Sequence, residues 1–373
     1  MKILFAAGGT GGHINPALAA AGEIRERHPD AQILFVGAKG KMETKLVPGA
    51  GFELKTIRIA GFQRKISLEN IFRNILAVIY LILSPLSVRK IIKDFAPDVV
   101  VGFGGYVSGP VVQMAAKMGI PTAIHEQNAY PGVTNKTLAK AVDKVMLTTE
   151  EAEKFLAPKN KPVVTGLPVR GEMLRADKDI SRAEMGINDN QKLVLSMGGS
   201  LGAMTINNAM VELISEYADN KNLYFLHGMG QYGLWVPQKL KEKGVDCETQ
   251  SNVEIREYIS DMDRCMAAAD VVICRAGASS LSELQALGKA SILIPSPNVA
   301  ENHQYHNAMA LVNKNAALII EEKDLTKEKM KELFEKLVFD DEKRLAMETS
   351  ARAMAVMDAK EKIADIIVSL AKK

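Results

Sequence analysis

The chain has 373 residues, 47% of them hydrophobic and 24% charged, with a formal net charge of +3 at pH 7. This length exceeds what one ordinary hydrophobic core needs, so we expect two domains, and the composition excludes a disordered chain. The small net charge gives no support for binding to nucleic acid, and we expect no nucleic-acid partner.

The cysteines and the N-terminus bear on the compartment. Cys247, Cys265 and Cys274 form no CxxC pair and cannot all pair with one another, so a reducing compartment is expected. The N-terminal segment MKILFAAGGTGG lacks the long apolar stretch of a signal peptide and is interpreted as a first β-strand. No run of about 20 apolar residues is present, so no membrane span is expected.

Short apolar runs alternate with amphipathic stretches, which is typical of a parallel sheet covered by helices on both faces. The strands expected in the first half lie at residues 2–7, 32–36, 53–59, 98–101, 122–125, 144–147 and 162–165. The helices expected between them include residues 16–27, 68–95 and 109–118. The second half predicts strands at residues 192–197, 222–227, 271–274, 291–294 and 317–320, and a last helix at 352–370.

The alternation is interrupted by a glycine- and proline-containing, charged stretch, which we interpret as an interdomain linker at residues 166–190. This divides the chain into an N-terminal domain at 1–165 and a C-terminal domain at 191–351. The final segment, 352–373, is expected to join the N-terminal domain.

Both domains open on the same pattern. LFAAGGTGG at residues 4–12 and VLSMGGSLG at 194–202 each combine a strand, two glycines, a hydroxyl residue and a further glycine. The repeat predicts two doubly wound α/β domains, whose strand ends would face one cleft.

Glycine clusters follow three of the expected strands, at residues 8–12, 102–109 and 198–202. Glycine permits a tight turn and a close backbone approach, and the N–H groups of the next helix can bind an anion. Neither the dinucleotide-binding spacing nor a P-loop is present. The clusters therefore predict phosphate sites, although one such turn alone is equally compatible with a strand–helix connection without a ligand.

Polar residues next to these turns suggest the chemistry. His13 follows the first turn and is a candidate general base, although a lone histidine is more often structural. Glu283 ends the small-residue segment CRAGASSLSE, where a carboxylate can accept hydrogen bonds from a ribose or merely complement a helix N-terminus. The D-x-D pattern of Asp261 and Asp263 is interpreted as a helix start, and we expect no metal site.

One uncharged segment begins at Ile75 and ends at Val88 (ILAVIYLILSPLSV). A buried core helix would explain it. Basic residues flank it on both sides, however, and an apolar patch ringed by positive charge also suits docking on an anionic membrane surface. The flanking residues are Arg64, Lys65, Arg73, Arg89, Lys90 and Lys93.

Taken together, the motifs resemble those of the MurG family. These bacterial enzymes of peptidoglycan synthesis move N-acetylglucosamine from UDP-GlcNAc to undecaprenyl-diphosphate-linked N-acetylmuramyl-pentapeptide. The matching segments are GGTGGH (8–13), GFGGYVSGP (102–110), HEQN (125–128), GLPVR (166–170), GGSLGA (198–203), CRAGASSLSE (274–283) and ENHQYHNA (301–308). The resemblance implies the GT-B architecture, with two Rossmann-like doubly wound parallel-sheet domains facing a central cleft. It also implies an inverting transferase without an obligatory metal, peripheral to the cytoplasmic face of the cell membrane.

The resemblance further implies roles for individual residues. His13 would be the base that takes the proton of the muramyl 4-hydroxyl. The acceptor would contact Gly104, Gly105, Tyr106 and Asn128. In the C-terminal domain, which would bind UDP-GlcNAc, the Ile259 backbone would contact uracil, Glu283 the ribose and Gln304 the sugar. Arg170 and Ser200 would bind the diphosphate. The full set of implied donor contacts is Thr10, Gly11, Gly12, Asn128, Arg170, Ser200, Ile259, Ala278, Ser279, Ser280, Glu283 and Gln304.

Two positions depart from the family pattern: His303 precedes Gln304 where two glutamines are common, and GLPVR replaces GNPVR. The contact at position 303 is therefore in doubt. Two other functions stay open. One is a non-catalytic module that binds nucleotide sugars or lipid diphosphates, and the other is a GT-B 2-epimerase acting on UDP-GlcNAc. UDP release that depends on a lipid acceptor would separate the transferase from both.

Overall fold

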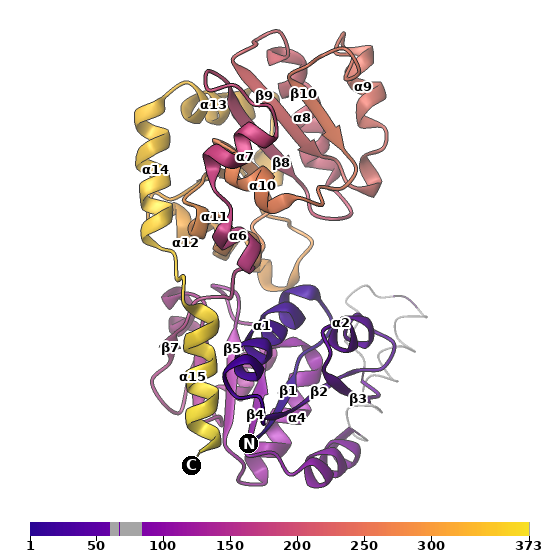
Figure 1. Cartoon of the computed structure of the whole chain (residues 1–373), viewed down its shortest axis with the longest axis vertical. Coiled ribbons are helices and arrows are strands. Elements are labelled where there is room, and N and C mark those ends of the chain that lie inside the picture. Colours follow the sequence, from indigo (N-terminus) through magenta and orange to yellow (C-terminus); the bar gives the residue numbers. More distant parts are fainter. Residues whose placement is uncertain (60–66, 68–83, 373) are drawn as a thin grey trace. The chain divides into compact units, whose positions relative to one another are not determined.

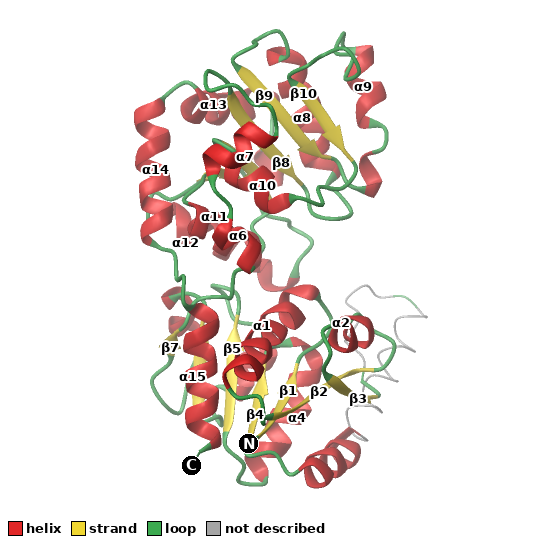
Figure 2. Ribbon diagram, viewed as in Figure 1, coloured by secondary structure: helices red, strands yellow, loops and turns green. Residues whose placement is uncertain are grey.

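The computed structural model describes residues 1–59, 67 and 84–372. The chain divides into two compact α/β units. Unit 1 comprises Met1–Pro168 and Asp358–Lys373, and unit 2 comprises Val169–Met357. Figure 1 follows the chain through both units, and Figure 2 shows the helices and strands of each.

Unit 1 is built on a parallel sheet with the strand order β3-β2-β1-β4-β5-β6-β7. Its strands are β1 (Lys2–Ala6), β2 (Gln32–Ala38), β3 (Glu53–Ile57), β4 (Val99–Gly102), β5 (Thr122–Glu126), β6 (Lys144–Leu147) and β7 (Val163–Val164). Its helices are α1 (Gly11–Arg27), α2 (Glu43–Gly49), α4 (Gly105–Lys117), α5 (Val133–Leu138), the 3₁₀ helix η1 (Glu150–Phe155) and α15 (Ala359–Ala371). Residues 84–95 are also helical.

The alternation of side chains along β1 divides the core of unit 1 between the two faces of the sheet. Ile3 and Phe5 pack with residues of α1 and with Ile363 and Ile367 of α15. Leu4 and Ala6 point to the other face, where they pack with α4 residues. The C-terminal helix α15 therefore completes the core of unit 1.

Unit 2 contains a parallel sheet with the strand order β10-β9-β8-β11-β12-β13. Its strands are β8 (Lys192–Met197), β9 (Leu223–Gly228), β10 (Val253–Arg256), β11 (Val271–Cys274), β12 (Ala290–Leu293) and β13 (Leu318–Ile319). Its α-helices are α6 (Gly171–Arg175), α7 (Lys178–Glu184), α8 (Met204–Tyr217), α9 (Val236–Glu242), α10 (Met262–Ala268), α11 (Ala278–Leu287), α12 (His303–Val312), α13 (Lys327–Val338) and α14 (Asp341–Ala353). Short 3₁₀ helices are η2 (Gln231–Gly233), η3 (Ala300–Asn302) and η4 (Glu322–Asp324).

Each sheet has a point at which the strand order reverses direction. In unit 1 this point lies between β1 and β4, and in unit 2 between β8 and β11. In open α/β sheets, ligands bind beyond the carboxyl ends of the strands at such a point. The loops that leave these four strands carry the motifs at residues 8–13, 102–106, 198–202 and 275–283. The topology thus accounts for the position of the motifs.

The two doubly wound parallel sheets confirm the expected fold class, but three details differ. The segment 166–190 contains α6 and α7, and the boundary between the units falls after Pro168. Part of this segment packs into unit 2, since buried Arg182 of α7 donates to Asp270 at 3.0 Å. The expected helix 352–370 is interrupted between Ala353 and Ala359, where the chain passes from unit 2 to unit 1. Strand β10 was not anticipated.

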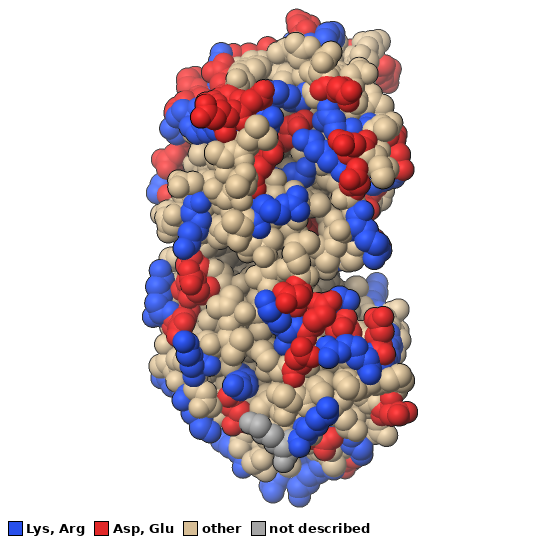
Figure 3. Space-filling model, turned by 60° about the vertical axis from the view of Figure 1, so that its left-hand side comes forward, with Lys and Arg blue, Asp and Glu red and all other residues tan. Residues whose placement is uncertain are grey.

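Of the apolar segment 75–88, residues 75–83 lie outside the described residues, and residues 84–88 are helical. Within the described part of the chain, no helix combines the length and apolar character that crossing a bilayer requires. On the face shown in Figure 3, acidic and basic side chains are interspersed.

Candidate functional site

The first glycine turn connects β1 to α1 and is shaped by contacts inside unit 1. Gly9 has φ +89°, a conformation that favours glycine. A Cβ on Gly8 would lie 2.5 Å from Oε1 of Glu43, so the missing side chain makes room for this buried carboxylate. Glu43 Oε2 accepts a hydrogen bond from the Gly9 N–H at 3.3 Å, and Oε1 accepts one from Ala38 at 2.7 Å.

The predicted base, His13, lies in the first turn of α1 after Thr10, Gly11 and Gly12. Its Nδ1 atom lies 3.1 Å from the carbonyl oxygen of Gly8 and 3.2 Å from the Thr10 hydroxyl. A carbonyl can only accept a hydrogen bond, so Nδ1 carries the proton in this arrangement. In the neutral ring, Nε2 then holds the lone pair, which is the form that a general base requires.

The predicted acceptor residues Gly104, Gly105 and Tyr106 meet this turn. A Cβ on Gly104 would lie 2.7 Å from Cδ2 of His13, and one on Gly105 would lie 2.2 Å from the Gly8 oxygen. The Tyr106 ring borders Gly9, with Cε1 3.3 Å from the position of a Cβ. Two motifs about 95 residues apart thus form one surface, as the neighbouring positions of β1 and β4 require.

Asn128, the other predicted acceptor residue, is held by a buried carboxylate. Glu126 Oε1 accepts from the Asn128 backbone N–H at 2.9 Å and from Nδ2 at 3.2 Å. Its Oε2 accepts from Gly132 and from Nδ2 of Asn135. Burial raises the pKa of Glu126, and these donors act in the opposite direction.

Beside Glu126 lies a pair of buried residues from the same HEQN motif. Gln127 donates from Nε2 to the Phe103 carbonyl at 3.0 Å, and a Cβ on Gly104 would lie 3.4 Å from its Oε1. His125 contacts the Gly166 carbonyl through Nε2 at 2.9 Å, and burial lowers its pKa to about 4. His125 is therefore neutral at pH 7 and supports the fold of the site.

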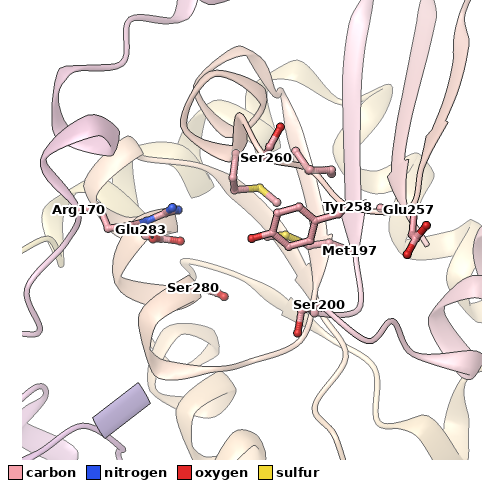
Figure 4. A pocket seen from close by; sticks show the side chains of 12 residues that line it. Arg170, Met197, Ser200, Glu257, Tyr258, Ser260, Ser280 and Glu283 are labelled. Atoms are coloured by element: carbon pink, nitrogen blue, oxygen red, sulfur yellow. Dashed lines mark hydrogen bonds and ion pairs between the residues drawn. The ribbon is translucent and has the colours of Figure 1, made fainter. Parts of the chain in front are cut away.

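Unit 2 contains a cavity of about 230 Å³ at its switch point. Figure 4 shows that side chains from the Gly198–Gly202 turn, the β10–α10 loop and α11 line it together with Arg170. Five of the predicted donor residues are among them, namely Arg170, Ser200, Ile259, Ser280 and Glu283. The lining also includes Met197, Glu257, Tyr258, Ser260 and Met262, for which the sequence suggested no role.

Arg170 and Glu283 form an ion pair in this cavity, with Nε 2.9 Å from Oε1. The Glu283 side chain is 12% exposed and that of Arg170 is 52% exposed. Burial raises the pKa of Glu283, and the positive charge of Arg170 counteracts this effect. Glu283 is in the second turn of α11, so complementing the helix N-terminus does not by itself explain its position.

The β10–α10 loop contributes Tyr258, Ile259 and Ser260 to the lining of the cavity. The Ile259 side chain is buried, and Gly228 makes room for it, because a Cβ there would lie 3.0 Å from Cδ1. The loop is held by Arg256, which pairs with Glu254 and with Asp261, each at 2.7 Å. Asp261 occupies the N-cap position of α10, where the sequence predicts a helix start, but its side chain makes no capping hydrogen bond and pairs with Arg256 instead.

The second glycine turn and the N-terminus of α11 provide backbone groups. Gly199 has φ +94°, and the neighbouring Ser200 is exposed. Ala278, Ser279 and Ser280 form the first turn of α11, where helix N–H groups are not used within the helix. Hydroxyl and N–H donors at a helix N-terminus are suited to a diphosphate.

Gln304 does not line this first cavity but a neighbouring one of about 460 Å³, together with Gly198, Gly202 and Arg275. Its Oε1 accepts from the Ser296 backbone N–H at 2.8 Å. Three and two residues before Gln304, Glu301 and Asn302 have φ values of +53° and +49°, and such strained residues cluster at ligand sites. His303 at the doubtful position contacts the Ala300 carbonyl through Nδ1 at 2.8 Å.

The predicted donor residues are thus divided between the units: Thr10, Gly11, Gly12 and Asn128 belong to unit 1 and the others to unit 2. Sequence reasoning missed Glu43, Glu126 and Tyr258. Glu126 lies in the same HEQN motif as Asn128, and Tyr258 directly precedes Ile259, so their place in the sequence could have indicated a role at the site. The described residues include no cluster of three or more His, Cys, Asp or Glu side chains arranged to bind a metal ion.

Comparisons with known proteins find similar domains and similar full-length chains. The model of the glycosyltransferase family 28 N-terminal domain matches residues 3–147, and that of the C-terminal domain matches residues 193–367. A UDP-N-acetylglucosamine–N-acetylmuramyl-(pentapeptide) pyrophosphoryl-undecaprenol N-acetylglucosamine transferase from Acetivibrio thermocellus is 44% identical, covering 100% of this chain and 99% of its own. The enzyme of the same name from Thermoanaerobacter sp. X514 is 46% identical over 99% of this chain and 100% of its own.

Solved structures show the same fold. The crystal structure of Acinetobacter baumannii MurG matches with a TM-score of 0.80 and 28% identity, covering 99% of both chains. A UDP-GlcNAc 2-epimerase from Neisseria meningitidis, bound to UDP-GlcNAc, matches with a TM-score of 0.66 over 99% of this chain and 100% of its own. Its identity is only 16%, so this likeness shows the fold alone.

Proposed function

The chain belongs to the MurG family within glycosyltransferase family 28, and from this premise we propose that it transfers N-acetylglucosamine to a lipid-linked muramyl sugar. The donor is UDP-GlcNAc, and the acceptor is undecaprenyl-diphosphate-linked N-acetylmuramyl-pentapeptide. The observation that carries the proposal is the unit 2 cavity, where Glu283, Ser200 and Ile259 come together at the switch point.

We assign donor binding to unit 2. The Ile259 backbone reads the uracil edge, and Glu283 accepts hydrogen bonds from the ribose hydroxyls. Ser200, the first turn of α11 and Arg170 stabilise the diphosphate as negative charge develops on the leaving UDP. Gln304 contacts the sugar hydroxyls from the neighbouring cavity.

We assign acceptor activation to unit 1. Gly104, Gly105, Tyr106 and Asn128 contact the acceptor, and Nε2 of His13 takes the proton of the muramyl 4-hydroxyl. The oxygen forms its bond to the anomeric carbon of the donor sugar as the bond to UDP breaks, so the configuration at that carbon is inverted. The contact of Nδ1 with the Gly8 carbonyl supports this role, because it places the basic lone pair on Nε2.

The decisive measurement is UDP release from UDP-GlcNAc with and without the lipid-linked acceptor. We expect release that depends on the acceptor and a disaccharide product. A 2-epimerase would convert UDP-GlcNAc without an acceptor, and a binding module would release no UDP with both substrates present. Either result would overturn the proposal.

His13→Ala is expected to lower kcat by a factor of about 10² to 10⁴ while leaving the KM for UDP-GlcNAc within a few-fold of the wild-type value. The reason is that the base acts on the acceptor hydroxyl in the transition state. Steady-state kinetics with both substrates varied checks this expectation. An unchanged kcat would remove His13 from the role of base.

We also propose that the protein works at the cytoplasmic face of the cell membrane, bound peripherally. The support lies at the described end of the apolar segment 75–88. Leu86 is 74% exposed, and Arg89, Lys90 and Lys93 are exposed on the same helical stretch. Positions 86, 89, 90 and 93 share one helix face, which combines an apolar anchor with positive charge.

A further inference from the structure

The Gly8–Gly9 peptide group forms hydrogen bonds with two ionisable side chains. Its carbonyl oxygen contacts Nδ1 of His13 at 3.1 Å, and its N–H donates to Oε2 of Glu43 at 3.3 Å. The C=O of Gly8 and the N–H of Gly9 belong to the same planar amide. One peptide bond therefore connects the imidazole of His13 with the carboxylate of Glu43.

Glu43 is built into this position. It is fully buried, and its other oxygen accepts from the Ala38 N–H at 2.7 Å. Two glycines provide its space, since a Cβ on Gly8 would lie 2.5 Å from Oε1 and a Cβ on Gly37 would lie 2.5 Å from Cγ. A buried carboxylate with both oxygens bonded to backbone N–H groups is held in one orientation.

We propose that Glu43 is a positioning residue that sets the basicity and tautomer of His13 through the Gly8–Gly9 peptide. A carboxylate that accepts from the amide N–H makes the amide oxygen more negative, and this oxygen is a stronger acceptor for the proton on Nδ1. The imidazolium form that arises when Nε2 takes a proton is stabilised in the same way. The inference rests on the proposed function, in which His13 is the base.

The groups around this chain of contacts allow the effect to be separated from others. Tyr106 of α4 faces Glu43, and burial, with a contribution from the negative charge of Glu43, raises the pKa of the Tyr106 phenol. That phenol is neutral near pH 7, so it does not supply a competing charge there. From β2, Gly37 borders Cγ of Glu43 and Ala38 donates its N–H to Oε1, and neither of these residues titrates.

The test compares Glu43→Gln with a matched control, Glu53→Gln. Both changes remove one negative charge from unit 1, but Glu53 is on β3 with its side chain 61% exposed and paired with Lys55. The protein is labelled at the ring carbons of its six histidines, and the His13 signal is assigned by its loss in His13→Ala. An NMR titration of the full chain without substrates then gives the pKa of His13 directly.

We expect Glu43→Gln to lower the pKa of His13 by about one pH unit, because removing the negative charge destabilises the imidazolium. Glu53→Gln should leave it unchanged. The acid limb of kcat/KM should move to lower pH in Glu43→Gln by the same amount, and the plateau should fall about tenfold. If Glu43 only supported the fold, Glu43→Gln would lower the plateau of kcat/KM without moving its acid limb to a different pH.

Glu43→Asp keeps the negative charge but shortens the side chain by one methylene group. The pKa of His13 in this variant should therefore lie between its values in the wild type and in Glu43→Gln. Glu43→Asp replaces Glu43→Gln in the comparison if Glu43→Gln does not fold. The affinity for UDP, which is assigned to unit 2, shows whether unit 2 is folded in each variant. A His13 pKa that is the same in wild type, Glu43→Gln and Glu43→Asp would overturn the inference. If His13→Ala keeps its kcat, the base assignment fails instead, and the NMR result still decides the coupling.

Discussion

Glycines at equivalent positions of the two turns serve different neighbours. Gly9 and Gly199 share a positive φ, +89° and +94°, as their common place after a strand predicts. Gly8 makes room for Glu43, whereas a Cβ on Gly198 would lie 2.4 Å from the Ala203 backbone nitrogen. The shared sequence pattern thus predicts the turn, but the contacts that require each glycine differ.

Gly105→Ala is expected to reduce both stability and activity. Its φ is +74°, and the new Cβ would lie 2.2 Å from the Gly8 oxygen that contacts His13. The matched control is Gly119→Ala, which has the same φ of +74° but open space around the Cβ. Urea unfolding should show Gly105→Ala less stable than Gly119→Ala by about 2 kcal/mol, and only Gly105→Ala should lose kcat. Equal losses in both would show that backbone strain alone is responsible.

Arg170→Ala is expected to make UDP binding more sensitive to acid. Burial raises the pKa of Glu283 and Arg170 lowers it, so removing Arg170 raises it further. A protonated Glu283 can no longer accept from both ribose hydroxyls, so affinity should begin to fall at a higher pH than in wild type. Calorimetric titration with UDP between pH 5 and 8 measures this shift. Arg175→Ala, which removes a positive charge from the last position of the short helix α6 that Arg170 precedes, is the control. Parallel pH profiles for wild type and Arg170→Ala would contradict the coupling.

Some residues of the site follow from the sequence and others do not. Ser200, Ile259, Ser280 and Glu283 were predicted within contiguous motifs, and they line one cavity. Glu43 carries no such signal because its role depends on Gly8 and Gly37, which reach it only through the pairing of β1 with β2. Long-range packing of this kind is invisible to local patterns.

At the scale of elements, hydrophobic periodicity predicts the buried strands well. Residues 144–147, 192–197 and 271–274 agree with β6, β8 and β11 at both ends. Strand β10 was missed because VEIR alternates apolar and charged residues over only four positions. In α7, buried Arg182 is paired with Asp270, and the sequence alone does not show which charges are paired.

The helical stretch 84–95 carries a prediction about membrane binding. Leu86→Glu replaces an exposed apolar residue beside Arg89, Lys90 and Lys93 with a negative charge. Its affinity for vesicles of anionic lipid should fall at least about tenfold in a sedimentation assay. The helix packs against the core through Val88 and Ile92, which the substitution leaves in place, so the free energy of unfolding should not change. Leu345→Glu, at a position 54% exposed in α14, is the control. Equal binding by both variants would remove Leu86 from the membrane surface.

At the scale of the whole molecule, the two sheets repeat one strand order around their switch points, yet each unit is completed differently. The last helix of the chain, α15, belongs to unit 1, and its residues Ile363 and Ile367 are part of the core of that unit. Unit 2 recruits α6 and α7 from the segment after β7. The duplication was evident in the sequence from the repeated turns, whereas these completions depend on packing between distant segments.

This division of the chain predicts where ligands protect the backbone from hydrogen exchange. UDP alone should protect the segments 198–203, 257–262 and 278–283, each of which contributes residues to the lining of the unit 2 cavity, because a bound ligand suppresses local opening. UDP-GlcNAc should add protection at residues 10–13 and 128 if the sugar contacts unit 1 as the sequence predicts. Glu283→Ala should lose the protection by UDP at concentrations that saturate the wild type, and Glu53→Gln should retain it. Protection of residues 10–13 by UDP alone would show that the nucleotide binds to unit 1. The assignment of donor binding to unit 2 and acceptor binding to unit 1 would then be wrong.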